Sequence, residues 1–220
     1  MELSYAIKVV LTGEFGVGKT SFVRDILYRH FTPQPEFCDF GCKTLTVKDK
    51  LVRAQIWDTC GLEKIRALTN SYYKGASAAM LFYDITNSNS FNSLTKWIDE
   101  IHKNTSPNVV IMLIGNKCDL HNAERQISTE SGENFAKQHN LLFYEMSIRD
   151  SINVDEAFVK LLEETVTKLE EIGFNCPSIP IIVNSVTSSI NENEGITLDK
   201  SNSRLLKSNF VSLIVIFDGN

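Results

Sequence analysis

Residues 5–28 read YAIKVVLTGEFGVGKTSFVRDILY, and this stretch decides the fold. Residues 5–11 form an apolar run with one lysine, which is typical of a buried strand in a parallel sheet. A glycine-rich turn follows, and the apolar residues of 20–28 then recur at helical spacing. A strand, a glycine-rich turn and a helix in this order predict an α/β domain that binds phosphate at the helix N-terminus.

The turn at residues 13–20, GEFGVGKT, matches the pattern G-x-x-x-x-G-K-[ST]. Glycines let the backbone wrap around a phosphate, and the backbone N–H groups then point at it. We expect Lys19 to reach the β- and γ-phosphates and the Thr20 hydroxyl to bind Mg²⁺. The predicted nucleotide contacts of this loop are Phe15, Gly16, Val17, Gly18, Lys19, Thr20 and Ser21. A chance glycine-rich turn is the alternative, which the flanking strand and helix disfavour.

A second motif, Asn116-Lys117-Cys118-Asp119, follows the strand predicted at residues 109–114. The Asp119 carboxylate can accept hydrogen bonds from N1–H and the exocyclic amine of guanine, a donor pair that adenine lacks. We expect Asn116 to tie this segment to the phosphate loop and the Lys117 stem to cover the base. A solvated polar turn is the alternative for one such tetrapeptide, but its order and spacing after the phosphate loop favour guanine recognition.

The rest of the pattern alternates between strands and helices. Further strands are expected at residues 43–47, 51–57, 76–83, 109–114 and 141–145, and helices at 90–104, 128–139 and 153–172. Residues 1–172 are therefore predicted to form a doubly wound α/β domain. Its six-stranded sheet should be mostly parallel, with one antiparallel edge.

Composition limits the classes of function. The 220-residue chain has a net charge of -5 and a pI of about 5.4, which gives no basic footprint for nucleic acid. Its five cysteines are scattered and contain no CxxC pair, which favours a reducing compartment over a disulfide framework or a zinc site. The N-terminus lacks the pattern of a secretory signal and the apolar runs are too short to span a bilayer, so we expect a cytoplasmic protein.

A third segment, Asp58-Thr59-Cys60-Gly61, follows the strand predicted at residues 51–57. In this order the three segments resemble the Ras superfamily of small GTPases, which implies GTP and GDP as ligands and Mg²⁺ as cofactor. The resemblance implies that Asp58 holds Mg²⁺ through water and that Gly61 offers its N–H to the γ-phosphate. It also implies base contacts from Ser147, Ile148 and Arg149 and an aromatic lid from Phe31. Ile148 and Arg149 replace the family's usual Ala-Lys, so we expect looser guanine packing.

Within this superfamily, residues 55–59, 70–76 and 83–86 resemble the Rab branch. Phe40, Trp57 and Tyr72 match the aromatic triad with which Rab proteins meet effectors, although core packing is an equal alternative for strand aromatics. The resemblance implies a GTP/GDP switch in vesicle trafficking, with effector and exchange-factor proteins as partners.

Three departures from the family concern hydrolysis. Leu62 occupies the position of the water-orienting glutamine, so the catalytic pair predicted here is Lys19 and a degenerate site at Leu62. Phe15 stands where the family has a small residue, and its ring should crowd the γ-phosphate and any arginine finger. Pro35 lies where a Mg²⁺-binding hydroxyl is usual, and Thr32 is the only nearby substitute.

These departures predict slow GTP hydrolysis. The main alternative is a non-hydrolysing pseudo-GTPase that acts as a nucleotide-binding scaffold. An ATP-dependent kinase with the same phosphate loop is a third possibility, which Asp119 disfavours.

The C-terminal part of the sequence departs as well. Residues 173–208 are rich in Ser, Asn, Thr and Glu, which predicts a polar linker. Residues 209–220 are apolar and then reach Asp-Gly-Asn, so they resemble either an extra edge strand or the start of a second G domain. Cys176 is too far inside the chain for a prenylation signal, so we expect no lipid anchor of its own. Attachment to vesicle membranes would then need partners or a further C-terminal part.

Overall fold

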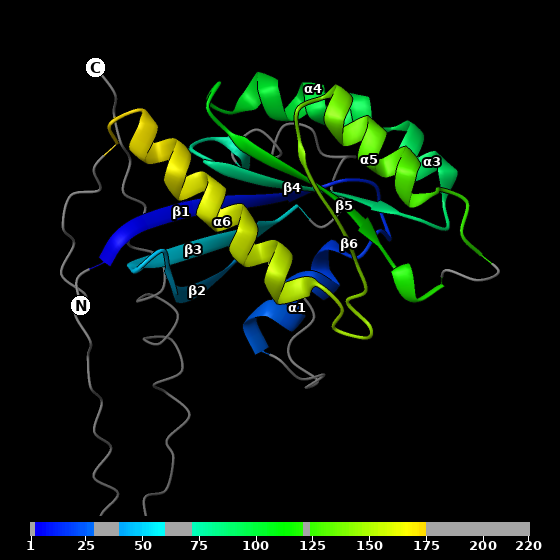
Figure 1. Cartoon of the computed structure of the whole chain (residues 1–220), viewed down its shortest axis with the longest axis horizontal. Coiled ribbons are helices and arrows are strands. Elements are labelled where there is room, and N and C mark those ends of the chain that lie inside the picture. The colour runs from blue at the N-terminus through cyan, green and yellow to red at the C-terminus, as the bar shows by residue number, and fades with distance from the viewer. Residues whose placement is uncertain (1–2, 29–39, 60–71, 121–123, 175–220) are drawn as a thin grey trace, which may run out of the picture. The chain divides into compact units, whose positions relative to one another are not determined.

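A computed structural model describes residues 3–28, 40–59, 72–120 and 124–174 (Figure 1). Its sheet has six strands in the order β2-β3-β1-β4-β5-β6. They are β1 (Leu3–Thr12), β2 (Phe40–Val47), β3 (Lys50–Asp58), β4 (Ala78–Asp84), β5 (Val110–Asn116) and β6 (Leu142–Met146). All neighbouring strands pair in parallel except β2, which runs antiparallel to β3 at the edge. The predicted sheet is confirmed, and its element bounds shift by a few residues at most.

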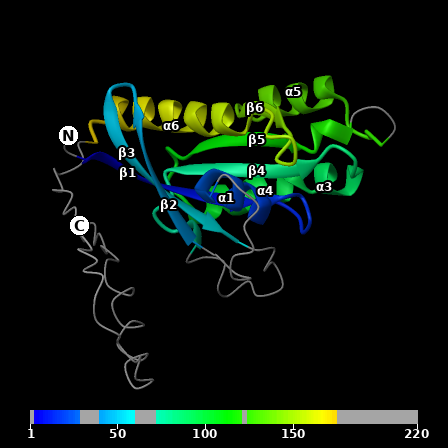
Figure 2. The ribbon, with the colours of Figure 1, turned by 90° about the horizontal axis from the view of Figure 1, so that it is seen from below.

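Helices cover both faces of the sheet, as a doubly wound fold requires (Figures 1 and 2). They are α1 (Lys19–Tyr28), α3 (Ser88–Asn92), α4 (Leu94–Asn104), α5 (Thr129–Gln138) and α6 (Val154–Glu171), with a short 3₁₀ helix at Cys118–Leu120. Helices α1 and α6 pack on one face, whereas α4 and α5 pack on the other. Among the described residues, no helix has the length and apolar character that crossing a bilayer requires.

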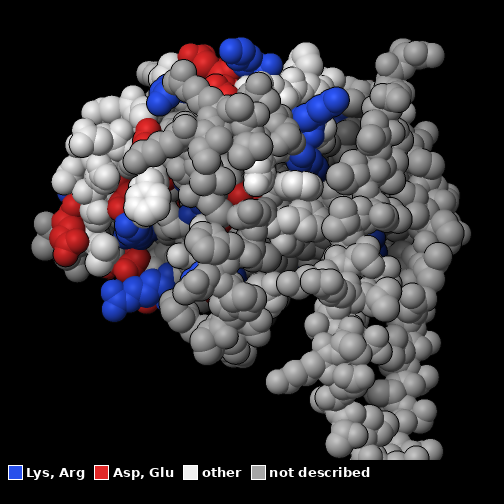
Figure 3. Space-filling view, turned by 180° about the vertical axis from the view of Figure 1, so that it is seen from behind, with Lys and Arg blue, Asp and Glu red and all other residues white. Residues whose placement is uncertain are grey.

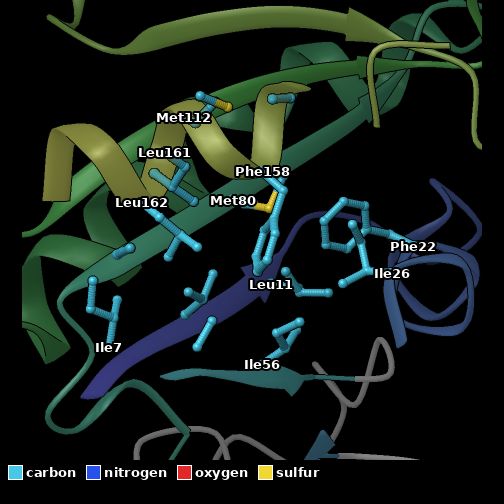
Figure 4. Packing of buried hydrophobic residues seen from close by; sticks show 14 of the residues in the cluster. Ile7, Leu11, Phe22, Ile26, Ile56, Met80, Met112, Phe158, Leu161 and Leu162 are labelled. Atoms are coloured by element: carbon cyan, nitrogen blue, oxygen red, sulfur yellow. The ribbon is translucent and has the colours of Figure 1, made fainter. Parts of the chain in front are cut away.

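Each face of the sheet has its own apolar cluster. On one face, the ring of Phe22 from α1 meets Phe82 of β4 and Phe158 of α6 edge-on, with centroids 5.6 and 5.8 Å apart. Figure 4 shows the apolar side chains of these two helices gathered over β1. On the other face, Trp97 and Ile98 of α4 pack into the second cluster. The last four residues of β1 and all of β4 are buried, which explains why these parts of the two strands are apolar runs.

The helix predicted over residues 90–104 is wrong in one respect, because it is two helices that meet at Ser93. Asn87 caps α3 by accepting hydrogen bonds from the N–H groups of Asn89 and Ser90. The hydroxyl of Ser93 donates to the Ser90 carbonyl at 3.1 Å, which offers the backbone a local alternative to a continuous helix. The apolar face of α4 nevertheless follows the predicted spacing.

Parallel pairing brings the carboxyl ends of β1, β3, β4, β5 and β6 to one edge of the sheet. Ligands of open α/β sheets bind at this edge. The predicted linker and tail at residues 173–208 and 209–220 lie outside the described residues, apart from Gly173 and Phe174. They stay predictions.

Candidate functional site

The predicted phosphate loop connects β1 to α1 and is closed tightly by its glycines. Gly13, Gly16 and Gly18 have φ values of 129°, 80° and 107°, a region that favours glycine. A Cβ at Gly13 would lie 2.3 Å from the Phe82 carbonyl oxygen, and one at Gly18 would lie 2.2 Å from Asn116 Nδ2. The loop therefore sits against β4 and the end of β5, where a side chain at Gly13 or Gly18 would collide with its neighbours, whereas Gly16 has open space around its Cβ position.

Lys19, the first residue of α1, is buried with 4% of its surface exposed. Its Nζ donates to the carbonyl oxygens of Gly13 at 2.5 Å and Glu14 at 2.8 Å. The ammonium is thus held by the backbone of its own loop, at the helix N-terminus where anions bind. A lysine held in this way fits the predicted contact with β- and γ-phosphates.

Thr20 of α1 and Asp58 at the end of β3 bring together two oxygen atoms that could act as metal ligands. The Thr20 hydroxyl donates to Asp58 Oδ2 at 2.5 Å, and Asp58 is fully buried. Mg²⁺ is usually held by one or two protein oxygens, water and substrate phosphates, so this donor set fits the ion. Over the described ranges, no cluster of three or more His, Cys, Asp or Glu residues could hold a metal by itself. The predicted pair of Thr20 and Asp58 therefore fits a cation shared with a nucleotide.

Asn116 joins the predicted base-binding segment to the phosphate loop, as expected. Its Nδ2 donates to the Val17 carbonyl at 2.8 Å, although 99 residues separate the two positions. The other side-chain atom, Oδ1, is buried and has no hydrogen-bond partner among the described residues. Since buried polar atoms usually have partners, this oxygen is suited to accept from a ligand or water.

The strand β6 brings the predicted base contacts at residues 147–149 to the same place. Ser147 Oγ donates to Asp119 Oδ1 at 2.7 Å, and Arg149 Nη1 lies 4.0 Å from Asp119 Oδ2. Ile148 lies against the phosphate loop, with its Cδ1 3.3 Å from the Cβ position built at Gly18. The predicted base contacts from residues 116–119 and 147–149 are thus neighbours. Whether Ile148 and Arg149 loosen guanine packing stays a prediction.

Sequence reasoning missed two acidic residues that support this site. Asp84, at the end of β4, forms an ion pair with Lys117, with Oδ2 2.5 Å from Nζ. Glu145 of β6 forms a two-pronged pair with Arg125, with N–O distances of 2.7 and 2.9 Å. These hydrogen bonds raise the pKa of Arg125. The only sequence signal for Asp84 is the Tyr-Asp-Ile-Thr segment at residues 83–86. This segment supports the resemblance to the Rab branch, but the sequence assigns no role to Asp84.

The three predicted effector aromatics meet in one group, which we call the aromatic cluster: Phe40, Trp57 and Tyr72. The ring centroids of Phe40 and Trp57 are 4.8 Å apart, and those of Trp57 and Tyr72 are 5.9 Å apart. Phe40 is 41% exposed and the other two are half-buried, so the group reaches the surface, while Tyr72 also packs against the apolar cluster beneath α4 and α5. Lys8 lies over the Trp57 ring, with its Nζ 4.4 Å from the centroid.

Several predicted residues lie outside the described residues, namely Phe31, Thr32, Pro35, Gly61 and Leu62. Phe15 is described, and its side chain is 82% exposed. Its predicted crowding of the γ-phosphate stays a prediction.

Acidic and basic side chains are interspersed on the described part of the face shown in Figure 3.

The sequence profile of the Ras family matches residues 8–167, which span most of the chain. The match covers the phosphate loop, the Thr20–Asp58 pair and the segments around Asn116 and Ser147. Proteins of this family bind guanine nucleotide and Mg²⁺, hydrolyse GTP and act with regulators and effectors. The chain belongs to the Ras family of small GTPases and is a GTP-binding switch.

Proposed function

We propose that this protein is a Rab-type GTP/GDP switch in vesicle trafficking, with weak intrinsic GTP hydrolysis. The observation that carries the Rab assignment is the aromatic cluster, in which Phe40, Trp57 and Tyr72 touch and stay partly exposed. Aromatic side chains that are exposed as a group favour contact with a protein partner. The partner class is an effector protein that binds the GTP form.

The geometry of the described residues supports the proposed nucleotide contacts. Lys19 would neutralise the β- and γ-phosphates at the N-terminus of α1, and Asp119 would accept from the guanine edge. Thr20 and Asp58 would hold Mg²⁺, which supplies positive charge at the phosphates when bound. The buried Asn116 Oδ1 would gain a partner. The family resemblance adds Gly61 at the γ-phosphate and Phe31 at the nucleoside, both of which lie outside the described residues.

Hydrolysis is proposed to be slow because the water that attacks the γ-phosphate lacks the glutamine that usually orients it. Leucine at position 62 can neither donate to nor accept from water, whereas the glutamine of the Ras template orients it. The exposed ring of Phe15 also stands in the phosphate loop, where an arginine finger from a partner would enter. We expect a rate at or below roughly 10⁻⁴ s⁻¹, compared with about 3–5 × 10⁻⁴ s⁻¹ for Ras alone.

Single-turnover hydrolysis with Mg²⁺ tests this proposal in three proteins: wild type, Leu62→Gln and Leu62→Gln/Phe15→Gly. Leu62→Gln should gain about tenfold, which corresponds to about 1.4 kcal/mol of transition-state stabilisation. An activating protein should accelerate only the double variant strongly. A wild type as fast as an ordinary family member would reject slow hydrolysis. No hydrolysis in any variant, with GTP bound, would favour the scaffold alternative.

The Rab assignment is tested by the distribution of the protein between cytoplasm and vesicle membranes. We propose a cytoplasmic protein that reaches these membranes through partners or a further C-terminal part, so the GTP-loaded form should be enriched on vesicles. Phe40→Ala and Tyr72→Ala should reduce this enrichment. Phe174→Ala is the matched control, because Phe174 is a 44% exposed aromatic residue outside the cluster. Equal loss in the control would reject a specific aromatic surface.

A further inference from the structure

Asp84 is a nearly buried carboxylate at the edge of the nucleotide site. It is the last residue of β4 and pairs with Asn116, the last residue of β5. Only 6% of its surface is exposed. Such a group needs partners for its charge, because an unpaired buried carboxylate is costly.

Both carboxylate oxygens of Asp84 have partners. Oδ2 lies 2.5 Å from Lys117 Nζ, whereas Oδ1 accepts from the backbone N–H and hydroxyl of Thr86 at 2.9 and 2.7 Å. Burial alone would raise the pKa of Asp84, but the hydrogen bonds from Lys117 and Thr86 and the charge of Lys117 lower it on balance. The carboxylate is therefore ionised and acts as a fixed acceptor for the Lys117 ammonium.

The backbone on either side of this pair is also fixed. Asp84 N donates to Ser90 Oγ at 3.0 Å, and Ile85 N donates to the Asn116 carbonyl at 3.1 Å. Lys117 itself has a φ of 71°, a conformation that is uncommon outside glycine. The backbone and the ammonium of Lys117 are thus both held, and its four-carbon stem spans the distance between two fixed points.

We propose that Asp84 is a positioning residue for guanine recognition, which holds Lys117 so that its alkyl stem covers the base. This inference rests on the base site proposed above. A free lysine stem has many rotamers, and ordering it on binding reduces affinity. An ion pair that exists before the nucleotide arrives removes this cost and should slow the release of the bound nucleotide.

A double-mutant cycle on release of fluorescently labelled GDP tests the inference. Asp84→Asn keeps the shape of the side chain but loses its charge, and we expect release about tenfold faster, the scale of one charge-assisted hydrogen bond. Lys117→Met should also accelerate release. The double variant should match Lys117→Met within about twofold, because Asp84 acts through Lys117.

Two further variants separate positioning from general loss of stability. Val166→Ala shortens a fully buried side chain of α6 outside the nucleotide site, and should lower the melting temperature without changing GDP release. Thr86→Val removes one hydrogen bond to Asp84 and keeps its charge, so it should give a smaller acceleration. It also serves as the test if Asp84→Asn does not fold.

Additive effects in the cycle would overturn the inference, as would unchanged or slower release in the Asp84 and Thr86 variants. If the wild type did not bind GDP, the proposed function itself would fail. That result is distinct from a wild type that binds GDP and shows no coupling between Asp84 and Lys117.

Discussion

Asp119 and Lys8 show how a neighbour sets the chemistry of a single side chain. Ser147 occupies Oδ1 of Asp119 and orients the carboxylate from β6. Lys8 Nζ donates to the Lys74 carbonyl at 2.8 Å while it lies over the Trp57 ring. Burial lowers the pKa of Lys8 to about 8 from 10.5. Each contact joins residues that are far apart in sequence. The Asp119 carboxylate and the Lys8 ammonium each lead to a prediction.

Replacing Asp119 with asparagine should change which base the protein prefers. Guanine donates from its exocyclic amine, whereas xanthine has a carbonyl there and is better matched by an amide than by a carboxylate. Asp119→Asn should therefore weaken GTP and GDP binding by at least about tenfold and improve binding of xanthine nucleotides. Calorimetry with both nucleotides measures this, and unchanged GTP affinity would contradict the base assignment.

Lys8 should give Trp57 a fluorescence transition near pH 8. In Trp97→Phe, the remaining tryptophan is Trp57, whose ring lies beneath the Lys8 ammonium. Loss of the proton as pH rises through about 8 should change its emission, and Lys8→Met should abolish the transition. Because the folded pKa lies below the unfolded value of 10.5, the stability of wild type relative to Lys8→Met should rise between these values. A transition that persists in Lys8→Met would have another origin.

At the scale of elements, helix α5 lies against the sheet through a glycine. Gly132 is buried in α5, and a Cβ there would lie 2.5 Å from Tyr83 Oη and 2.8 Å from the Phe143 ring. These atoms belong to β4 and β6, so the glycine sets how closely the helix approaches the two strands. Tyr83 Oη is itself buried and without a hydrogen-bond partner among the described residues. Burial is also the main reason why the pKa of Tyr83 is raised.

Gly132→Ala should destabilise the protein although alanine favours helix. Helix propensity gains about 1 kcal/mol, but overpacking against two rings costs typically 1–3 kcal/mol. We expect a net loss of about 1 kcal/mol in the free energy of unfolding, measured with urea. Asn134→Ala, on the exposed face of the same helix, is the control and should be neutral or slightly stabilising. An increase in stability for Gly132→Ala would show that the contact relaxes without strain.

At the scale of the whole molecule, the parallel sheet gathers the site from segments spread over the chain. The phosphate loop follows β1, Asp58 ends β3, Asp84 ends β4, and Asn116 ends β5. Two apolar clusters pack against the sheet from both faces, so we expect the ends of these strands to move little. Nucleotide-dependent change is therefore expected in segments between the strands, as in other switches of this kind.

The segment at residues 30–40, in which the family usually has a Mg²⁺-binding hydroxyl, should respond weakly to the γ-phosphate. Pro35 has neither hydroxyl nor N–H, so the segment lacks its usual tether to Mg²⁺. Hydrogen exchange over residues 30–40 should then differ little between the GDP and GTP forms. Strong protection that is specific to GTP would contradict this and would point to Thr32 as a substitute ligand. Thr32→Val distinguishes an untethered segment from one that Thr32 tethers to Mg²⁺. The variant should change the hydrogen exchange of the GTP form only if Thr32 binds the ion.

The sequence by itself determined the fold class and the main parts of the site. Strand runs, helical spacing and the 13–20 loop are local patterns, and they predicted the sheet, its antiparallel edge and the tie between Asn116 and the phosphate loop. The strands, the helices and the 13–20 loop are readable because each depends on the spacing of residues within one segment. The tie joins positions 99 residues apart, and it was expected from the order of the motifs along the chain. Of the residues whose roles were carried over from the family, the structure brings the described ones together at one end of the sheet, among them Thr20 with Asp58 and Ser147 with Asp119.

Only the tertiary structure decided which side chains support those motifs. The division of α3 from α4 at Ser93, the support of Lys117 by Asp84 and the position of Lys8 over Trp57 were not predicted. Asp84 and Lys117 are 33 residues apart, and their contact depends on β4 and β5 ending side by side. Local sequence patterns carry no distance between such positions. The register of the sheet and the packing of both faces supply it, which is why the supporting residues appear only in the folded protein.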